Sequence, residues 1–372
     1  MSKHQLTISP SYVQDWTYVE AVREIFQNSL DNQVTEPDNT MYFNYDEETE
    51  TLVIGNKTSI LEVNSLLMGY SSKRDDVNTI GRHGEGYKVA LMVLLREGKE
   101  ITISNYGKKE LWETRFINSR KFKGERITEI TVKSNFIFKS PPHNNLEFII
   151  KGITVDEYAV LVEKNLNLQT REEGVDFLTT SQGELLLSES EKGKLYVSGL
   201  FITDSSELGK GYNFKPSVIT LDRDRKLVND FDLRWEVSKL LQELEDHPIV
   251  IELLMSDAKD ANFYSSTRSY FPSKPQKVVE EKVLEEFVKE HGSDSIPVHN
   301  NEQLRIVQKT GVGTPVLVSK SVSELLDSHY AERKVVLKEP KQLFNEWLEE
   351  VESKLSDEEI EDFKILVDKY VK

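Results

Sequence analysis

The sequence predicts an α+β fold in which helices cover an antiparallel-rich sheet. Apolar residues recur at helical spacing over 18–32 and 86–96, which predicts two amphipathic helices. Residues 41–55 have the pattern of a β-hairpin with an acidic turn, and apolar and polar residues alternate in several segments between 100 and 150, as in antiparallel strands. We therefore expect the first 150 residues to form a layer of helices on a sheet.

Each of these elements rests on its own residues. The first helix has an apolar face formed by Val22, Ile25, Phe26 and Leu30. The second helix follows a polar stretch at about 71–86 and is predicted to bury Val89, Ala90, Val93 and Leu94. Strand-like alternation follows in the segments 101–104, 112–116, 127–132 and 146–150. A further helix is expected at 154–165.

The chain is predicted to divide into three units. The first covers 1–168, and the second, an α/β unit, covers 169–270. The second unit is centred on an apolar segment, 194–202, which we interpret as one buried strand. A turn-rich section at 209–216 and a long helix at about 228–245 follow.

The third predicted unit, 271–372, is mostly helical and has no recognisable motif. Prolines and serines cluster at 265–277, which is the best candidate for a linker. Beyond it we expect helices near 279–290, 301–309, 341–355 and 357–371, and a short strand at 315–318.

The composition is that of a globular protein without a membrane span. Of the 372 residues 38% are apolar and 30% charged, and no apolar run reaches the length of a membrane helix. The N-terminus lacks the apolar core of a signal peptide, and there is no cysteine for disulfides or thiolate zinc sites, so we expect a cytoplasmic protein. The net charge of −17 disfavours direct binding to nucleic acid, although a local basic groove is compatible with it.

The first helix carries a polar stripe. Glu24, Asn28 and Asp31 fall within about 60° of one another around the helix, opposite its apolar face. A solvated helix face would explain this pattern alone, but Asn28 is a poor helix former in mid-helix. An amide oxygen ligates Mg²⁺, and a carboxylate one turn away orients or deprotonates a water. The stripe is therefore a candidate metal–phosphate site.

A glycine-rich segment, 81–88, leads directly into the second helix. Gly81, Gly84 and Gly86 would let the backbone approach a phosphate, and the helix that follows would present the positive end of its dipole. A plain flexible loop is the alternative. The segment is not a Walker A loop, because Lys88 does not directly follow the last glycine, and its spacing differs from the dinucleotide-binding fingerprint.

Hydroxyls and a cation precede these glycines. Ser71, Ser72 and Lys73 lie in the segment 69–74, and such residues suit a mobile lid over a phosphate tail. A solvated loop is again the alternative.

The order and spacing of these three motifs resemble the GHKL ATPases, a superfamily that includes gyrase, the heat-shock chaperone, histidine kinases, MutL and the MORC proteins. Residues 22–31, Val-Arg-Glu-Ile-Phe-Gln-Asn-Ser-Leu-Asp, resemble its N box, E-x-x-x-N-x-x-D, and residues 79–88 resemble the glycine box that closes the ATP lid. The segment 69–73, together with Gly86-Tyr-Lys88, is most similar to the MORC and chaperone branch, and the chain as a whole most resembles the heat-shock chaperone, MutL and MORC branch. The resemblance spans about 18–245 and implies a Bergerat-fold α/β sandwich followed by a transducer-like domain.

The resemblance also implies roles for individual residues. Glu24 takes the position of the general base, and Asn28 that of the Mg²⁺ ligand. The residues that would bind ATP are Asn28, Asp31, Asn56, Ser71, Ser72, Lys73, Gly81, Gly84, Glu85, Gly86, Tyr87 and Lys88.

The adenine box departs from the family pattern. The family usually has D-x-G-x-G after the second strand, and its Asp accepts a hydrogen bond from the adenine amino group. Here Asn56 stands in place of that Asp, and Thr58 and Ile60 replace the glycines. Asn can still accept through its carbonyl oxygen, but the bond is no longer charge-assisted.

Part of the second unit resembles the transducer or middle domain of the chaperone and MutL branch. The segments that carry this resemblance are 196–204 and 221–226. In those relatives a basic residue of this region reaches the γ-phosphate. Arg225 is the best match, with Arg223 and Lys226 as competitors, and a solvated turn with internal Asp–Arg pairs is an equal alternative.

Taken together, the resemblance implies an ATPase with ATP and Mg²⁺ as its cofactors. It would hydrolyse ATP slowly and use nucleotide binding for closure or homodimerisation, together with a protein partner. One alternative is a nucleotide-gated protein-binding module with little turnover, favoured by Asn56 and by the acidic C-terminal region. A second alternative is a DNA-associated ATPase. A histidine kinase is disfavoured, because no phosphoacceptor helix hairpin is evident.

Overall fold

The computed structural model of the chain describes residues 1–67, 86–119, 121–122, 124–219, 221, 230–244, 247–256, 258–267, 276–334, 344–345, 347–348, 351 and 354–370. The chain divides into two compact units. The first comprises Met1–Leu178, Lys194–Asp204 and Tyr212–Asp232, and the second comprises Thr179–Gly193, Ser205–Gly211 and Leu233–Lys372. The boundaries expected at 168 and 270 stay predictions.

A seven-stranded sheet in the order β1-β6-β5-β4-β7-β3-β2 is the centre of the first unit. Its strands are β1 (Ser2–Leu6), β2 (Met41–Asp46), β3 (Thr51–Asn56), β4 (Glu100–Asn105), β5 (Glu110–Asn118), β6 (Arg126–Ser134) and β7 (Leu146–Lys151). Neighbouring strands are antiparallel throughout. The predicted hairpin and the four alternating segments are confirmed, whereas the edge strand β1 was not expected.

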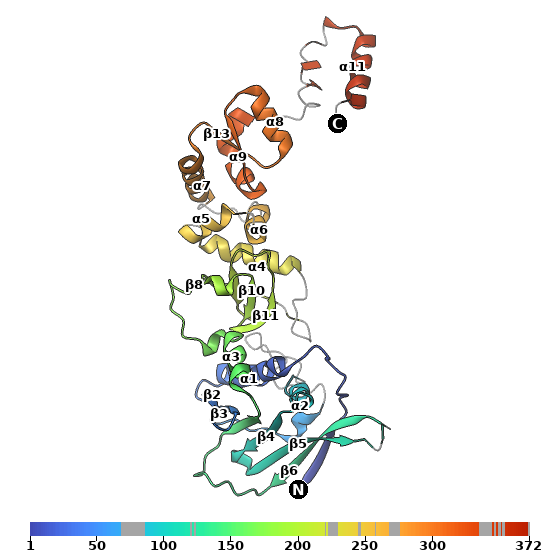
Figure 1. Cartoon of the computed structure of the whole chain (residues 1–372), viewed down its shortest axis with the longest axis vertical. Coiled ribbons are helices and arrows are strands. Elements are labelled where there is room, and N and C mark those ends of the chain that lie inside the picture. Colours follow the sequence, from blue (N-terminus) through green and yellow to red (C-terminus); the bar gives the residue numbers. More distant parts are fainter. Residues whose placement is uncertain are drawn as a thin grey trace. The chain divides into compact units, whose positions relative to one another are not determined.

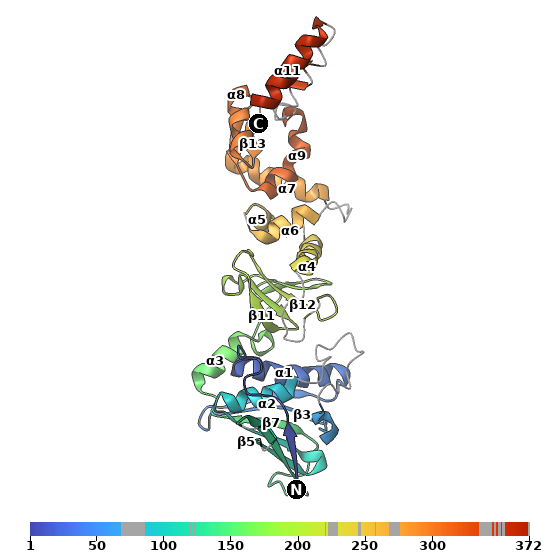
Figure 2. The same cartoon turned by 90° about the vertical axis from the view of Figure 1, so that its right-hand side faces the viewer.

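Two helices, α1 (Tyr18–Thr35) and α2 (Gly86–Arg96), lie side by side over one face of this sheet (Figure 1, Figure 2). A third helix, α3 (Val155–Glu163), contacts α1. Helices and sheet share one apolar core whose fully buried members include Ile25, Leu52, Leu91, Ile103 and Trp112. Both predicted apolar faces are confirmed, except that Leu30 is half-buried.

A capping box fixes the start of α1. The Thr17 side-chain oxygen accepts a hydrogen bond from the Val19 N–H at 3.2 Å, and the Glu20 carboxylate accepts from the Thr17 N–H at 2.7 Å. These bonds satisfy N–H groups that have no partner within the helix. The helix therefore begins at a defined residue, which sets the side of α1 on which each later side chain lies.

A second sheet has five strands in the order β11-β10-β12-β9-β8. Its strands are β8 (Phe177–Thr179), β9 (Gly183–Leu186), β10 (Lys194–Val197), β11 (Leu200–Asp204) and β12 (Gly211–Phe214). The prediction of one strand over 194–202 was wrong: β10 and β11 form a hairpin. Ser198 (φ 50°) and Gly199 (φ 78°) make its two-residue turn, because a tight turn between twisted strands needs positive φ at both positions. The strand β12 lies in the section predicted to be turn-rich.

The second of the two compact units of the structure is largely helical. Its longer helices are α4 (Asp230–Glu243), α5 (Pro248–Leu254), α6 (Lys259–Thr267), α7 (Gln276–His291), α8 (Asn301–Thr310), α9 (Lys320–Lys334) and α11 (Asp357–Tyr370). Strands β13 (Ser295–Val298) and β14 (Thr314–Leu317) pair in parallel around α8, which makes a βαβ unit. Short 3₁₀ helices elsewhere are Val63–Leu66, Tyr106–Lys108, Leu166–Leu168 and Glu189–Glu191.

Most of the helices predicted for the C-terminal half are confirmed, as is the strand at 315–318. The helices α5, α6 and α9 and the strand β13 were not expected, and the helix predicted near 341–355 lies mostly outside the described residues. The proposed linker overlaps the end of α6, and its residues 268–275 lie outside the described part of the chain. Among the described helices, none combines the length and the apolar character needed to cross a lipid bilayer.

Candidate nucleotide site

The Glu24 carboxylate lies against the backbone of Gly86, so that two of the sequence motifs meet. Glu24 is on α1 and 1% exposed, and Gly86 is the first residue of α2. A Cβ atom added at Gly86 would overlap Glu24 Oε2 and lie 3.1 Å from its Cδ. Glycine at this position therefore makes the room that the carboxylate occupies. The interpretation of this stripe as a solvated face is wrong for Glu24 and Asp31, which is 2% exposed.

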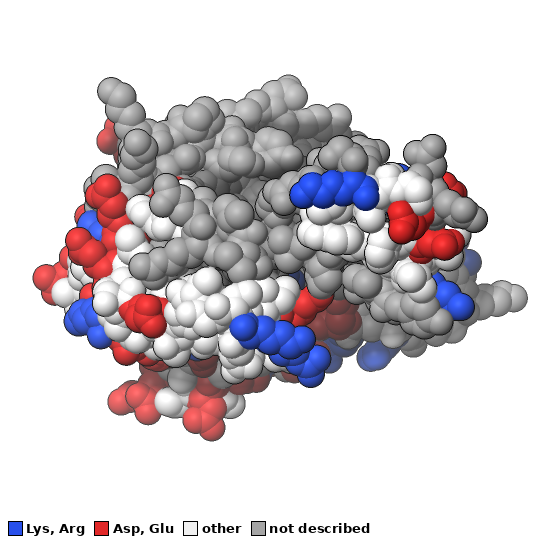
Figure 3. All heavy atoms as spheres, turned by 90° about the horizontal axis from the view of Figure 1, so that it is seen from above, with Lys and Arg blue, Asp and Glu red and all other residues white. Residues whose placement is uncertain are grey.

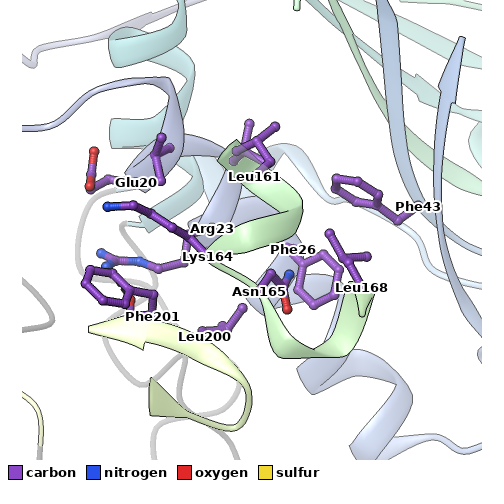
Figure 4. Close-up of a pocket in the computed structure, with 12 residues that line it drawn as sticks. Glu20, Arg23, Phe26, Phe43, Leu161, Lys164, Asn165, Leu168, Leu200 and Phe201 are labelled. Carbon is purple, nitrogen blue, oxygen red and sulfur yellow. Dashed lines mark hydrogen bonds between the residues drawn. The ribbon is translucent and has the colours of Figure 1, made fainter. Parts of the chain in front are cut away.

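Among the described residues, Arg23 is a charged neighbour of this carboxylate, at a position for which the sequence motifs define no residue. Its guanidinium lies 3.7 Å from Glu24 Oε1 and donates a long hydrogen bond, 3.4 Å, to the Phe201 carbonyl of β11. It also lies over the Trp16 ring, 5.9 Å from the ring centre. The close-up in Figure 4 shows Arg23 beside Lys164, whose ammonium group lies 4.4 Å from the centre of the Phe201 ring.

These cations border an apolar pocket within the first unit (Figure 4). Its apolar lining includes Phe26, Phe43, Leu161, Leu168 and Leu200. Residues of α1, of α3 and of strand β11 line the pocket, so that the β10–β11 hairpin lies beside the helix that bears Glu24.

The amide of Asn28 has a defined orientation. Its Nδ2 donates to the Glu24 main-chain carbonyl, one turn earlier, at 2.8 Å. This bond turns Oδ1, the atom that ligates a hard cation, away from that carbonyl. Among the described residues there is no group of three His, Cys, Asp or Glu side chains with the arrangement of a metal site. An amide oxygen such as Asn28 Oδ1 fits a Mg²⁺ ion whose other ligands are phosphate and water oxygens.

The Asn56 side chain is held in a buried polar network. It is 2% exposed, and its Nδ2 donates to the main-chain carbonyls of Ser29 and Asn39 at 2.9 and 3.2 Å. In turn, Asn39 donates to the Ser59 hydroxyl at 2.7 Å and accepts from the Thr58 N–H at 2.9 Å. The two donated bonds use the amide nitrogen of Asn56 and leave Oδ1 as its accepting end. Asn39 and Ser59 carried no signal in the sequence, because polar residues in a loop are normally exposed.

Tyr87 and Lys88 point into the protein. The Tyr87 ring packs against Phe148 in the core, its hydroxyl lies 2.8 Å from the Ser65 hydroxyl, and burial raises the pKa of that hydroxyl. Lys88 is fully buried, and its ammonium group donates to the main-chain carbonyl of Leu67. A buried ammonium group needs such acceptors, because its desolvation is costly.

The remaining predicted site residues lie outside the described part of the chain. They are Ser71, Ser72, Lys73, Gly81, Gly84, Glu85, Arg223, Arg225 and Lys226. Their roles stay predictions, as do those of the residues placed above.

Comparison with solved structures identifies ATPase regions of type II topoisomerases. The ATPase region of Saccharomyces cerevisiae topoisomerase II is 13% identical, with a TM-score of 0.32. The match covers 50% of this chain and 62% of that region, so the chain spans less than two thirds of its length. The same region bound to dexrazoxane is 11% identical, with a TM-score of 0.35 and coverage of 62% and 86%. The ATPase and transducer domains of DNA topoisomerase II from Balamuthia mandrillaris are 14% identical, with a TM-score of 0.33 and coverage of 65% and 69%.

No family model matches the chain, and no curated protein matches it. At TM-scores this low the structural likeness is partial, and the fold is defined by the chain's own elements. The α+β architecture expected from the sequence is confirmed by the antiparallel sheet and the helices that cover one of its faces.

Proposed function

We propose that this protein binds ATP with Mg²⁺ and hydrolyses it slowly, with Glu24 as the general base. The observation that carries the proposal is the buried Glu24 carboxylate against Gly86. A carboxylate in a desolvated site is costly to keep and is expected where chemistry needs it. The order and spacing of the N box and the glycine box along the sequence support the same conclusion.

The proposed reaction is in-line attack of water on the γ-phosphate. Glu24 orients the water and accepts its proton while the new P–O bond forms and the bond to the β–γ bridging oxygen breaks, which yields ADP and phosphate. Asn28 Oδ1 would hold Mg²⁺, which when bound neutralises charge on the phosphates. Backbone amides of Gly84 and Gly86, with Lys73 and Lys88, would hold the triphosphate.

We further propose that Asn56 accepts a hydrogen bond from the adenine amino group through Oδ1. The two hydrogen bonds from its Nδ2 to main-chain carbonyls support this orientation of the amide. Asp31, Ser71, Ser72, Gly81, Glu85 and Tyr87 complete the proposed binding set, and Arg225 is the proposed γ-phosphate contact.

ATP turnover by Glu24→Gln tests the proposal, with Glu36→Gln as the matched control at the exposed end of the same helix. Removing a general base should lower turnover by a factor of about 10²–10⁴ and leave ATP binding, measured by titration calorimetry, within a few-fold of wild type. The control should keep the wild-type rate. Equal turnover by wild type and Glu24→Gln would remove Glu24 from the role of base.

A nucleotide-gated protein-binding module is the second candidate, favoured by the uncharged Asn56 at the base-binding position. It predicts stable binding of ATP without phosphate release over hours. ATP-dependent homodimerisation, measured by light scattering, is compatible with both candidates. On the face drawn in Figure 3 the described basic side chains are interspersed with acidic ones.

A further inference from the structure

A groove in the second unit lies between two helices that the proposed reaction does not use. It runs between α5 and α7, which are neighbours in the fold (Figure 1), and its volume is about 430 Å³. Its lining consists of Pro248, Ile251, Glu252, Met255, Lys282, Glu285, Glu286 and Glu290. A hollow of this size accommodates one or two side chains of a partner.

The groove has an apolar floor and an acidic rim. Ile251 and Met255, from α5 and its end, supply the floor together with Pro248. The rim carries four glutamates against one lysine, and its members Glu285, Glu286 and Glu290 are exposed. Glu286 forms an ion pair with Lys289 at 2.8 Å, but both side chains are more than half exposed, so the pair is weak.

The fold explains why these carboxylates face outward. Helix α7 buries Val279, Val283 and Phe287, one turn apart from each other, against the rest of the unit. The glutamates on the adjacent part of α7 are therefore held at the groove by a helix that core packing has fixed. Burial of that stripe fixes the backbone that carries the glutamates before any partner arrives, so that binding has to order only their side chains.

We infer that this groove binds a Lys- or Arg-containing segment of another protein, with one apolar side chain over Ile251 and Met255 and flanking basic side chains on Glu252, Glu286 and Glu290. Charge complementarity selects this occupant. The same acidic rim repels nucleic-acid phosphates and anionic lipid headgroups. The inference is independent of the nucleotide site, and ATP binding by the same variants is measured separately.

The test uses the full chain and a fluorescent twelve-residue peptide of alternating lysine and leucine, with a second peptide in which glutamate replaces each lysine. The groove variant combines Glu252→Gln, Glu286→Gln and Glu290→Gln. Because the net charge of −17 attracts any basic peptide, the control variant combines Glu47→Gln, Glu48→Gln and Glu125→Gln, three exposed residues of the first unit. Both variants lose the same charge.

Fluorescence anisotropy should show the lysine peptide bound by wild type and control alike, and about tenfold more weakly by the groove variant, because three exposed ion pairs are lost. The glutamate peptide should not bind. A floor variant, Met255→Gln, should weaken binding without changing the charge. Equal losses in the groove and control variants, or no loss in either, would overturn the proposal. So would a dimer, detected by light scattering, that Met255→Gln dissociates while peptide binding is absent, since the occupant would then be a second copy.

Discussion

Helices α1 and α2 cover the same face of the same sheet, yet they bury different kinds of side chain. Every residue of α2 from Tyr87 to Leu94 is buried, and all except Lys88 are apolar or aromatic. Helix α1 buries four polar side chains as well as four apolar ones; the polar ones are Glu24, Gln27, Ser29 and Asp31. Apolar packing explains α2 apart from Lys88, whereas α1 buries the two carboxylates Glu24 and Asp31.

This difference separates residues that stabilise the fold from a residue that we propose takes part in the reaction. Each buried valine, leucine or methionine side chain of α2 contributes about 1.5–3 kcal/mol to folding. A buried carboxylate on α1 gives no such gain, and its desolvation must be offset by neighbours such as Arg23. One of these buried carboxylates, Glu24, lies against Gly86. Substitutions in α2 should therefore affect folding first, and substitutions around Glu24 should affect turnover first.

The largest expected effect is on folding, from Leu91→Ala in α2. Leu91 is fully buried, so that the loss of its side chain leaves a cavity and should lower the free energy of unfolding by about 2–5 kcal/mol. Val34→Ala, near the end of α1 where the side chain is 50% exposed, should change it by less than about 0.5 kcal/mol. Urea unfolding measures both, and similar values for the two variants would contradict the role given to α2.

Gly86→Ala should affect turnover more than folding. The new methyl group would overlap the end of the Glu24 side chain, which is the flexible part, so the carboxylate moves while the backbone stays. Misplacing a catalytic group by about 1 Å costs about a hundredfold in rate. The control is Gly107→Ala, whose methyl group would lie 3.6 Å from Ile60, an ordinary contact. A variant with wild-type turnover, or one that fails to fold, would break the distinction between the helices.

Asn56→Asp should destabilise the protein even though it introduces the acid that GHKL ATPases usually have in the motif that this segment resembles. The amide nitrogen donates to two main-chain carbonyls, and a carboxylate in its place would face both with an acceptor. The expected loss is about 1–3 kcal/mol in urea unfolding. Asn44→Asp, at an exposed position of β2, makes the same chemical change and should be close to neutral. A gain in stability for Asn56→Asp would show that the side chain lies the other way round.

The smallest expected effect concerns Glu129, a carboxylate on the sheet that has partners of its own. The hydrogen bond from Arg115 is the largest cause that lowers its pKa, and Lys3 adds to it. Because the pKa is lowered in the folded state, the stabilisation is present above the unfolded-state pKa and is lost as the pH falls through the folded-state pKa. Arg115→Gln should lower the free energy of unfolding at pH 7 by less than about 1 kcal/mol, and the difference from wild type should shrink towards pH 3. A difference that grows on acidification would contradict this sign.

Periodicity predicted α1, α2 and the strands β2 to β7, because each has a clear apolar face. It failed where polar and apolar patterns mislead. The hairpin turn at Ser198 and Gly199 lies inside an apolar run, so that 194–202 had the pattern of one strand. The edge strand β1 is mostly polar, and its partner lies more than a hundred residues away.

The residues of the candidate site were likewise predictable only in part. Glu24 and Gly86 belong to recognisable motifs, and the structure brings them together. Arg23 stands at a position that the N box does not define and Asn39 lies outside the motifs, because their contacts with Phe201 and with Asn56 depend on the tertiary fold. Local sequence carries no record of such distant partners.

The pairing of β1 with β6 also has a consequence for the synthesis of the chain. Ser2 pairs with Val132 and Leu6 with Thr128, so that β1, which is synthesised before β6, cannot pair with it until more than a hundred further residues have followed. At about 5–20 residues per second that delay is roughly ten seconds. During it the strand Ser-Lys-His-Gln-Leu is open to other chains, and its lysine and polar side chains make it a poor template for aggregation. The polar composition of β1, which kept it from being predicted by periodicity, thus also makes the nascent chain less prone to aggregate.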